Sequence, residues 1–250
     1  MADASTFHDE RTPDPRPAAP DADLDGGDRA RALAHDLLAI GAVALRPDAP
    51  FTWSSGLRAP IYCDNRRTLA HPRIRSAICS DLAAVVGTQD LAPATVAGTA
   101  TAGIPHAAWL ADRIEQPMAY VRSAAKSHGR KNRIEGVVAE GDEVVVVEDL
   151  ISTGRSALEA VEALRAIGAT VQAVLAIFTY QLDTAAAAFD DADVPLHTLT
   201  DYGTLIDVAR EQEEVPADAL ETLRAWRRNP KAWSDRWAAE DGESRMEDGG

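Results

Sequence analysis

"VVVVEDLISTGRSALEAVEALRAIGA", residues 144–169, is the stretch that decides the fold. The run of valines is typical of a strand buried on both faces, and the apolar residues after Arg155 return at the spacing of a helix. Glu148 and Asp149 end the strand although they are charged, so we expect them to face something polar. In open parallel sheets, ligands bind beyond the carboxyl ends of the strands, where loops lead into helix N-termini. The stretch therefore predicts a buried strand, a binding loop and a helix.

The same alternation of strands and helices continues on both sides of this stretch. Strands are predicted at 94–98, 117–121, 136–138, 143–148, 170–180 and 195–199, and helices at 72–86, 103–114 and 155–167. Strands that alternate with helices predict an α/β fold, with a central, mostly parallel sheet that is flanked by helices.

The two ends of the chain differ from its middle. Residues 1–28 are rich in Asp, Pro, Ala and Gly and carry almost no large apolar residue, which predicts a disordered acidic tail. Residues 29–212 are expected to form one folded domain. Residues 213–250 are expected to be a helical extension followed by a disordered tail, with Trp226, Trp233 and Trp237 docking on the domain or on a partner subunit.

Composition narrows the class of protein. The net charge of -15 makes nucleic acid an unexpected partner, because phosphate backbones need a basic face. Cys63 and Cys79 are too few for a disulfide framework and lack metal-ligand spacing, which favours a reducing cytoplasm. No apolar stretch approaches the roughly 20 residues that a bilayer crossing requires, so no membrane association is expected.

The loop after the acidic strand end has the composition of a phosphate site. Ser152, Thr153 and Ser156 supply hydroxyls, Gly154 permits close backbone approach, and the helix that follows supplies free N–H groups. A simple capping turn explains the same residues about equally well. The spacing GxxxxGK[ST] is absent, so this loop is not a P-loop.

Two acids, two apolar residues and a Ser-Thr-Gly loop after a hydrophobic strand resemble the phosphoribosyl pyrophosphate signature of the type I phosphoribosyltransferases. The resemblance implies that Glu148 and Asp149 meet the ribose hydroxyls and that residues 152–156 hold the 5-phosphate. Arg155 departs from the small residue of many members. The phosphoribosyl pyrophosphate site that the resemblance implies consists of Glu148, Asp149, Leu150, Ile151, Ser152, Thr153, Gly154, Arg155 and Ser156.

Positive charge gathers in "YVRSAAKSHGRKNRIEG", residues 120–136, which contains two of the three lysines. A solvated face is the ordinary explanation of such a run, but local charge also attracts anionic substrates. The pattern Arg-x-x-x-Lys-x-His-Gly is similar to the catalytic loop of orotate phosphoribosyltransferases. The resemblance implies catalytic and pyrophosphate-binding roles for Arg122, Lys126 and His128, and a homodimer in which this loop is shared across subunits.

Two further segments resemble the same family. "FTWSSGLRAPIYCDNR", residues 51–66, resembles its small N-terminal hood, which implies orotate contacts from Phe51, Arg58 and Asn65 in addition to Ser152. "AGTATAGIPHAAWLADR", residues 97–113, is similar to its pyrophosphate loop and implies contacts from Thr101 and Gly103. Some relatives carry lysine at the positions of Ser54, Ala102, Ser123 and Ala124.

Together these resemblances imply the type I phosphoribosyltransferase fold and a Mg²⁺-dependent enzyme. Its expected reaction transfers the phosphoribosyl group from 5-phosphoribosyl 1-pyrophosphate to orotate, giving orotidine 5-phosphate and pyrophosphate for pyrimidine synthesis. No metal ligands are assigned. One alternative is a purine phosphoribosyltransferase, which should lack both the hood and the basic loop. Another is a regulatory protein that senses phosphoribosyl pyrophosphate without turnover.

Overall fold

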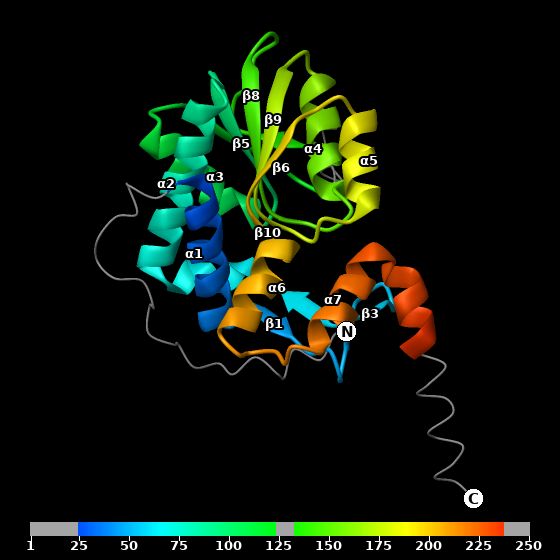
Figure 1. Ribbon diagram of the computed structural model, residues 1–250. Coiled ribbons are helices and arrows are strands. Elements are labelled where there is room, and N and C mark those ends of the chain that lie inside the picture. Colours follow the sequence, from blue (N-terminus) through cyan, green and yellow to red (C-terminus); the bar gives the residue numbers. More distant parts are fainter. Residues whose placement is uncertain (1–24, 124–132, 238–250) are drawn as a thin grey trace, which may run out of the picture.

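The structure is a computed structural model and describes residues 25–123 and 133–237. A parallel sheet carries helices on both faces, and a group of short strands lies at one end of it (Figure 1). The elements are α1 (Gly26–Ala39), β1 (Val43–Leu45), β2 (Phe51–Thr52), β3 (Arg58–Ala59), β4 (Ile61–Cys63), the 3-10 helix η2 (Asn65–Ala70), α2 (Pro72–Thr88), β5 (Thr95–Thr99), α3 (Gly103–Arg113), β6 (Met118–Val121), β7 (Ile134–Glu135), β8 (Glu143–Ile151), α4 (Arg155–Arg165), β9 (Thr170–Thr179), α5 (Asp183–Asp191), β10 (Leu196–Asp201), α6 (Tyr202–Glu211) and α7 (Ala219–Arg228).

The main sheet has the strand order β10-β9-β8-β5-β6-β7 among the described residues. All neighbours pair in parallel except β6 and β7, which pair antiparallel through Tyr120 with Glu135 and Val121 with Ile134. The expected α/β fold with a mostly parallel sheet is confirmed. Strand β8 lies in the interior of the sheet, so its acidic end is flanked by β5 on one side and by β9 on the other.

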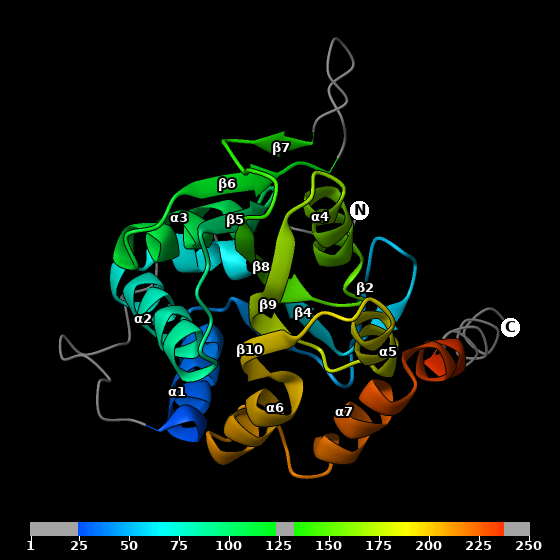
Figure 2. The ribbon, with the colours of Figure 1, turned by 90° about the horizontal axis from the view of Figure 1, so that it is seen from above.

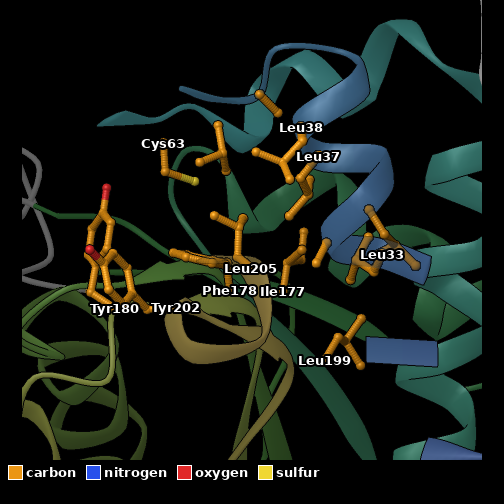
Figure 3. Close-up of a cluster of buried hydrophobic side chains, with 14 of the residues drawn as sticks. Leu33, Leu37, Leu38, Cys63, Ile177, Phe178, Tyr180, Leu199, Tyr202 and Leu205 are labelled. Carbon is orange, nitrogen blue, oxygen red and sulfur yellow. The ribbon is translucent and has the colours of Figure 1, made fainter. Parts of the chain in front are cut away.

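The valine run of β8 serves both faces of the sheet, because successive side chains of a strand point to opposite sides. Val144 and Val146 belong to a core with residues of α4 and α5. Val145 and Val147 belong to a larger core with residues of α1, α2, α3, α6 and α7. Figure 2 shows α4 and α5 on one side of the sheet and α1, α2 and α3 on the other. Part of the larger core appears in Figure 3, where leucines of α1 approach residues of β9 and α6.

The segment expected to form a hood consists of two short antiparallel pairs. Strand β1 pairs with β4, and β2 pairs with β3 across the Ser-Gly turn. This hood (residues 43–70) lies near the end of the sheet from which α6 starts, which is the carboxyl end of the parallel strands (Figure 1). It therefore faces the edge at which the ligand was expected.

Three boundaries differ from the sequence prediction. The first helix begins at Gly26, inside the predicted tail of residues 1–28, because the Asp25 side chain caps it by accepting a hydrogen bond from the Asp28 N–H (2.9 Å). The strand predicted at 136–138 is wrong: β7 ends at Glu135, because Gly136 has a φ of +100°, which does not continue a strand. Strand β8 extends to Ile151, past the acids that were expected to end it.

The chain after residue 212 packs closely on the rest of the domain. Trp226 of α7 is fully buried, Trp233 is 3% exposed, and the Tyr202 hydroxyl donates a hydrogen bond to the Leu223 carbonyl (3.0 Å). The expected docking of these tryptophans is confirmed for the parent domain. Within the described part of the chain, no helix combines the length and the hydrophobicity that a membrane crossing needs.

Candidate active site at the carboxyl edge of the sheet

The acids at the end of β8 are tied to the helix that follows the loop. The Ser156 hydroxyl donates to Glu148 Oε2 (2.9 Å), and the Asp149 N–H donates to Glu148 Oε1 (3.0 Å). Glu148 is 5% exposed, so both of its oxygens are held in a defined direction. This arrangement connects the acidic strand end to the start of α4 across the loop of residues 152–154.

Asp149 lies in an electrostatically unfavourable place. Burial, together with the neighbouring Glu148 carboxylate, raises the pKa of Asp149 to about 8. A hydroxyl donor or a cation that approaches such a carboxyl group stabilises its charged form and so lowers its pKa. The site is therefore suited to a ligand that carries such groups, and perturbed carboxyl groups are common at functional sites.

The loop between β8 and α4 depends on a glycine. Gly154 has a φ of +79°, and a Cβ atom there would lie 2.7 Å from the ring of Phe189 in α5. The loop can therefore turn tightly into α4 and leave the backbone N–H groups of the first turn facing outward. Arg155 points away from this turn, because its Nε donates to Glu159 Oε1 (2.9 Å) and its side chain is 84% exposed.

Two neighbouring strands bring other predicted residues to the same edge. Thr101 follows β5, which pairs directly with β8, and Arg122 follows β6, which pairs with β5. Arg122 exchanges hydrogen bonds with Arg133: its N–H donates to the Arg133 carbonyl (2.8 Å), and Arg133 Nε donates to the Arg122 carbonyl (2.8 Å). The Arg122 guanidinium lies 3.5 Å from Glu135 Oε1. Lys126 and His128 lie outside the described residues.

Gly103 has a structural reason that the sequence did not reveal. A Cβ atom there would lie 2.4 Å from the Val147 carbonyl oxygen and 2.6 Å from Thr99 Oγ1. The start of α3 therefore packs directly against the backbone of β8. This packing by itself requires a glycine at residue 103, and the predicted contact with pyrophosphate stays a prediction. Thr101 is exposed and remains available to a ligand.

A cavity of about 590 Å³ opens beside the loop, between the hood and the ends of β8 and β9. Ser152 and Thr153 form one side of it, and Trp53, Tyr62 and Tyr180 supply aromatic rings. None of its lining residues in the described chain is charged. The full lining is Trp53, Ser54, Ser55, Leu57, Tyr62, Cys63, Leu150, Ser152, Thr153, Tyr180 and Leu182. An uncharged slot with aromatic walls and several hydroxyls suits a flat, polar ring.

The three hood residues predicted to contact the base do not line this cavity. Phe51 packs behind Tyr62 with the ring centroids 5.7 Å apart, and Arg58 lies in β3, where its N–H donates to Ser234 Oγ (2.9 Å). Asn65 is fully buried and its Nδ2 donates to the Asp149 carbonyl (2.6 Å). Asn65 thus connects the hood to the acidic strand end instead of facing the cavity.

Sequence reasoning missed the aromatic walls for an identifiable reason. The rule that points to Glu148 and Asp149, that strand ends face the ligand, applies equally to β9, which ends next to Tyr180. Trp53 lies just before the Ser-Gly turn of the hood, and Tyr62 lies in β4. Ile151 was predicted to bind the ligand, but its side chain is 1% exposed and packs in the core, so only its backbone is near the loop.

Comparison with known proteins agrees with this geometry. Residues 68–199 match the family described as "Phosphoribosyl transferase domain". The orotate phosphoribosyltransferase of Bacillus pumilus is 52% identical over 208 residues, which cover 83% of this chain and 97% of that protein. The enzyme of the same name from Cutibacterium acnes is 53% identical over 206 residues, covering 82% and 95%.

A solved structure shows the same architecture. The crystal structure of orotate phosphoribosyltransferase from Aeropyrum pernix superposes with a TM-score of 0.64 and is 33% identical, covering 74% of this chain and 99% of that one. The type I phosphoribosyltransferase fold expected from the sequence is therefore confirmed. The chain belongs to the phosphoribosyl transferase domain family and, within it, to the orotate phosphoribosyltransferases.

Proposed function

We propose that this protein transfers the phosphoribosyl group of 5-phosphoribosyl 1-pyrophosphate to orotate, giving orotidine 5-phosphate and pyrophosphate for pyrimidine synthesis. The observation that carries the proposal is the position of the loop after β8. Its Ser152 and Thr153 border the uncharged aromatic cavity, and its Ser156 is bonded to Glu148 at the acidic strand end. A sugar phosphate held on this loop would therefore lie beside a flat base in the cavity.

The reaction needs a nitrogen of the base to reach the anomeric carbon of the sugar. The base nitrogen uses its electron pair for the new bond to the anomeric carbon, and its proton passes to solvent. The bond from the anomeric carbon to the pyrophosphate oxygen breaks, and pyrophosphate leaves with the electron pair of that broken bond. Glu148 and Asp149 would accept hydrogen bonds from the ribose hydroxyls and keep the sugar in register. Charge on the departing group requires nearby cations and exclusion of water. Arg122, Lys126 and His128 are the residues we assign to that task.

Magnesium is the cofactor that the family implies. No cluster of three or more acidic, His or Cys side chains able to hold a metal is found among the described residues. The residues present nevertheless fit Mg²⁺, which commonly uses one or two carboxylates together with substrate oxygens. Asp149 is the donor we propose, because its carboxyl group is buried beside Glu148 and a cation there would stabilise its charged form. When bound, the ion would neutralise charge on the pyrophosphate.

The proposal also includes a homodimer and a cellular compartment. A homodimer would place the segment of residues 124–132 of one subunit over the site of the other, as the resemblance of the basic loop implies. The cytoplasm is the expected compartment, because Cys63 and Cys79 are both free thiols buried in the structure.

The experiment is the decrease of orotate absorbance with phosphoribosyl pyrophosphate and Mg²⁺, for the wild type and for Lys126→Ala. Turnover that falls at least about a hundredfold in the variant is the expected result, since a positioned cation on the leaving group is worth that much. Lys231→Ala is the matched control, because Lys231 is paired with Asp235 in the C-terminal helical segment, and it should keep full activity. Turnover with a purine base and none with orotate would contradict the proposal, as would binding of phosphoribosyl pyrophosphate without any turnover.

A further inference from the structure

Trp226 of α7 lies at the centre of a group of aromatic rings, which we call the aromatic brace (Trp53, Tyr180, Tyr202 and Trp226). Its ring centroid is 5.6 Å from Trp53, 5.8 Å from Tyr180 and 5.3 Å from Tyr202. Trp53 and Tyr180 also contact each other directly, at 5.0 Å. Both of these rings line the base cavity, whereas Trp226 does not and is fully buried behind them.

The four rings come from separate parts of the chain. Trp53 belongs to the hood, Tyr180 follows β9, Tyr202 starts α6 and Trp226 lies in α7. Tyr180 and Tyr202 lie at the same end of the buried cluster in Figure 3. Trp226 is the member that contacts all three others. The hood wall and the β9 wall of the cavity therefore both rest on a side chain from α7.

Hydrogen bonds hold α7 and the cavity walls in register. The Tyr202 hydroxyl donates to the Leu223 carbonyl (3.0 Å), one turn before Trp226. Arg227 Nη1 donates to the carbonyl of Gln181 (3.1 Å), the residue after Tyr180. Trp53 Nε1 donates to the Ile61 carbonyl (3.0 Å), which sets the direction of its ring. The brace is thus bonded to both walls and to α6.

Stability alone does not explain a tryptophan at this place. Its Nε1 is buried and has no hydrogen-bond acceptor among the described residues, which costs free energy that a phenylalanine would avoid. The indole is larger than a phenyl ring and stacks edge-on against Trp53 and Tyr180, at 78° and 80°. Its size lets one ring support both walls from behind.

We propose that Trp226 is a positioning residue for the base: it packs against both Trp53 and Tyr180 from behind, holds the orientation of the two rings and so sets the fit of the cavity to a flat pyrimidine. This inference rests on the proposed function, because it assumes that the cavity is the base site. The phosphate loop and the acidic strand end lie on β8 and α4, which do not contribute rings to the brace. Loss of Trp226 should therefore disturb the base and leave phosphoribosyl pyrophosphate in place.

The test is the pair of KM values of Trp226→Phe. The KM for orotate is expected to rise at least about tenfold, since small misplacements of bound reactants have large effects, while the KM for phosphoribosyl pyrophosphate stays unchanged. A KM does not depend on the fraction of active enzyme, so partial unfolding by itself does not move it. Leu33→Val is the matched control, because Leu33 is equally buried in the same core but lies in α1 and makes no contact with the brace among those described.

A second variant protects the test against a Trp226→Phe protein that does not fold. Tyr202→Phe keeps every ring and removes only the bond to the Leu223 carbonyl, and it should raise the orotate KM in the same direction by a smaller factor. An unchanged orotate KM in the folded variants, or an equal rise in both KM values, would overturn the inference. Absence of orotate turnover in the folded wild type would instead overturn the proposed function.

Discussion

At the scale of single residues, the site is built from charges and amides that the fold holds close together. Asp149 is the clearest case, since burial and the Glu148 carboxylate raise its pKa to about 8. The side chain of Asn65, which belongs to the hood, donates a hydrogen bond to the Asp149 carbonyl. The Cys63 thiol in turn donates to Asn65 Oδ1 (3.4 Å), and Cys63 lines the base cavity. A chain of contacts thus runs from the base cavity to the acid assigned to the ribose.

Asp149 should make the binding of phosphoribosyl pyrophosphate depend on pH. A carboxyl group with a raised pKa is mostly protonated below that pKa and ionised above it. With a pKa of about 8, its ionised fraction increases about tenfold between pH 7 and pH 9. If the ionised form is the one that accepts the ribose hydroxyls, the affinity should increase by about the same factor.

Titration calorimetry of phosphoribosyl pyrophosphate with Mg²⁺ at the two pH values checks this prediction. Asp149→Asn cannot titrate, so its affinity should be weaker and should not change with pH. Asp207→Asn is the control, because Asp207 lies on α6, is half exposed and pairs with Arg224 of α7, and it should keep the wild-type profile. A wild-type affinity that is the same at both pH values would refute the assigned role of Asp149.

At the scale of elements, the start of α3 against β8 is the tightest junction near the site. Thr101 lies in the short connection between β5 and α3, and β5 pairs with β8. This short connection is possible only if α3 begins directly against the Val147 carbonyl of β8. A glycine at residue 103 allows that approach, and any side chain would have to displace backbone atoms.

Gly103→Ala should therefore destabilise the protein by about 3 kcal/mol. This is the upper end of the usual cost of overpacking, because the added Cβ atom would meet backbone atoms that cannot move aside easily. Chemical denaturation monitored by circular dichroism gives the free energy of unfolding. Gly87→Ala is the matched control: Gly87 lies within α2, and a Cβ atom there meets nothing within 4 Å. Alanine should stabilise that helix by up to about 1 kcal/mol. Equal effects of the two variants would contradict the packing explanation.

At the scale of the whole molecule, the hood, the sheet and the last helices form one packed unit. The larger core includes residues of α1, the hood, the sheet, α6 and α7, with Trp226 and Trp233 among them. The sequence suggested a domain that ends near residue 212, but α7 and the helical residues 230–237 close the far side of the hood.

A chain that stops at residue 212 should therefore fail to fold stably. It would expose Tyr202 and Tyr180 and lose Trp226, whose removal alone should cost about 3–5 kcal/mol, a large part of the 5–15 kcal/mol of an ordinary domain. Calorimetric unfolding of chains 1–212 and 1–237 makes the comparison. The longer chain is the control and should keep a single cooperative transition. A cooperative transition of normal enthalpy in chain 1–212 would show that the domain ends where the sequence suggested.

The sequence by itself determined the sheet, the acidic strand end and the loop. These features are local: a valine run, two acids and a Ser-Thr-Gly turn follow one another along the chain, and the carboxyl ends of parallel strands meet at one edge. Ser152, which the family resemblance assigned to the base, lines the cavity, and its contact with orotate stays a prediction. The errors of boundary in the sequence prediction, at Gly26 and at 136–138, came from a side-chain cap and from the backbone conformation of a glycine.

Only the tertiary structure decided which residues surround the base cavity. Phe51, Arg58 and Asn65 have suitable side chains but do not line the cavity: Phe51 packs against Tyr62, and Asn65 bonds to the Asp149 carbonyl. Trp53 and Tyr180 are more than a hundred residues apart, yet they contact each other directly, and α7 places Trp226 against both. Contacts between distant segments leave no periodic signal in the sequence, since they depend on how whole elements pack and not on the order of residues within one of them.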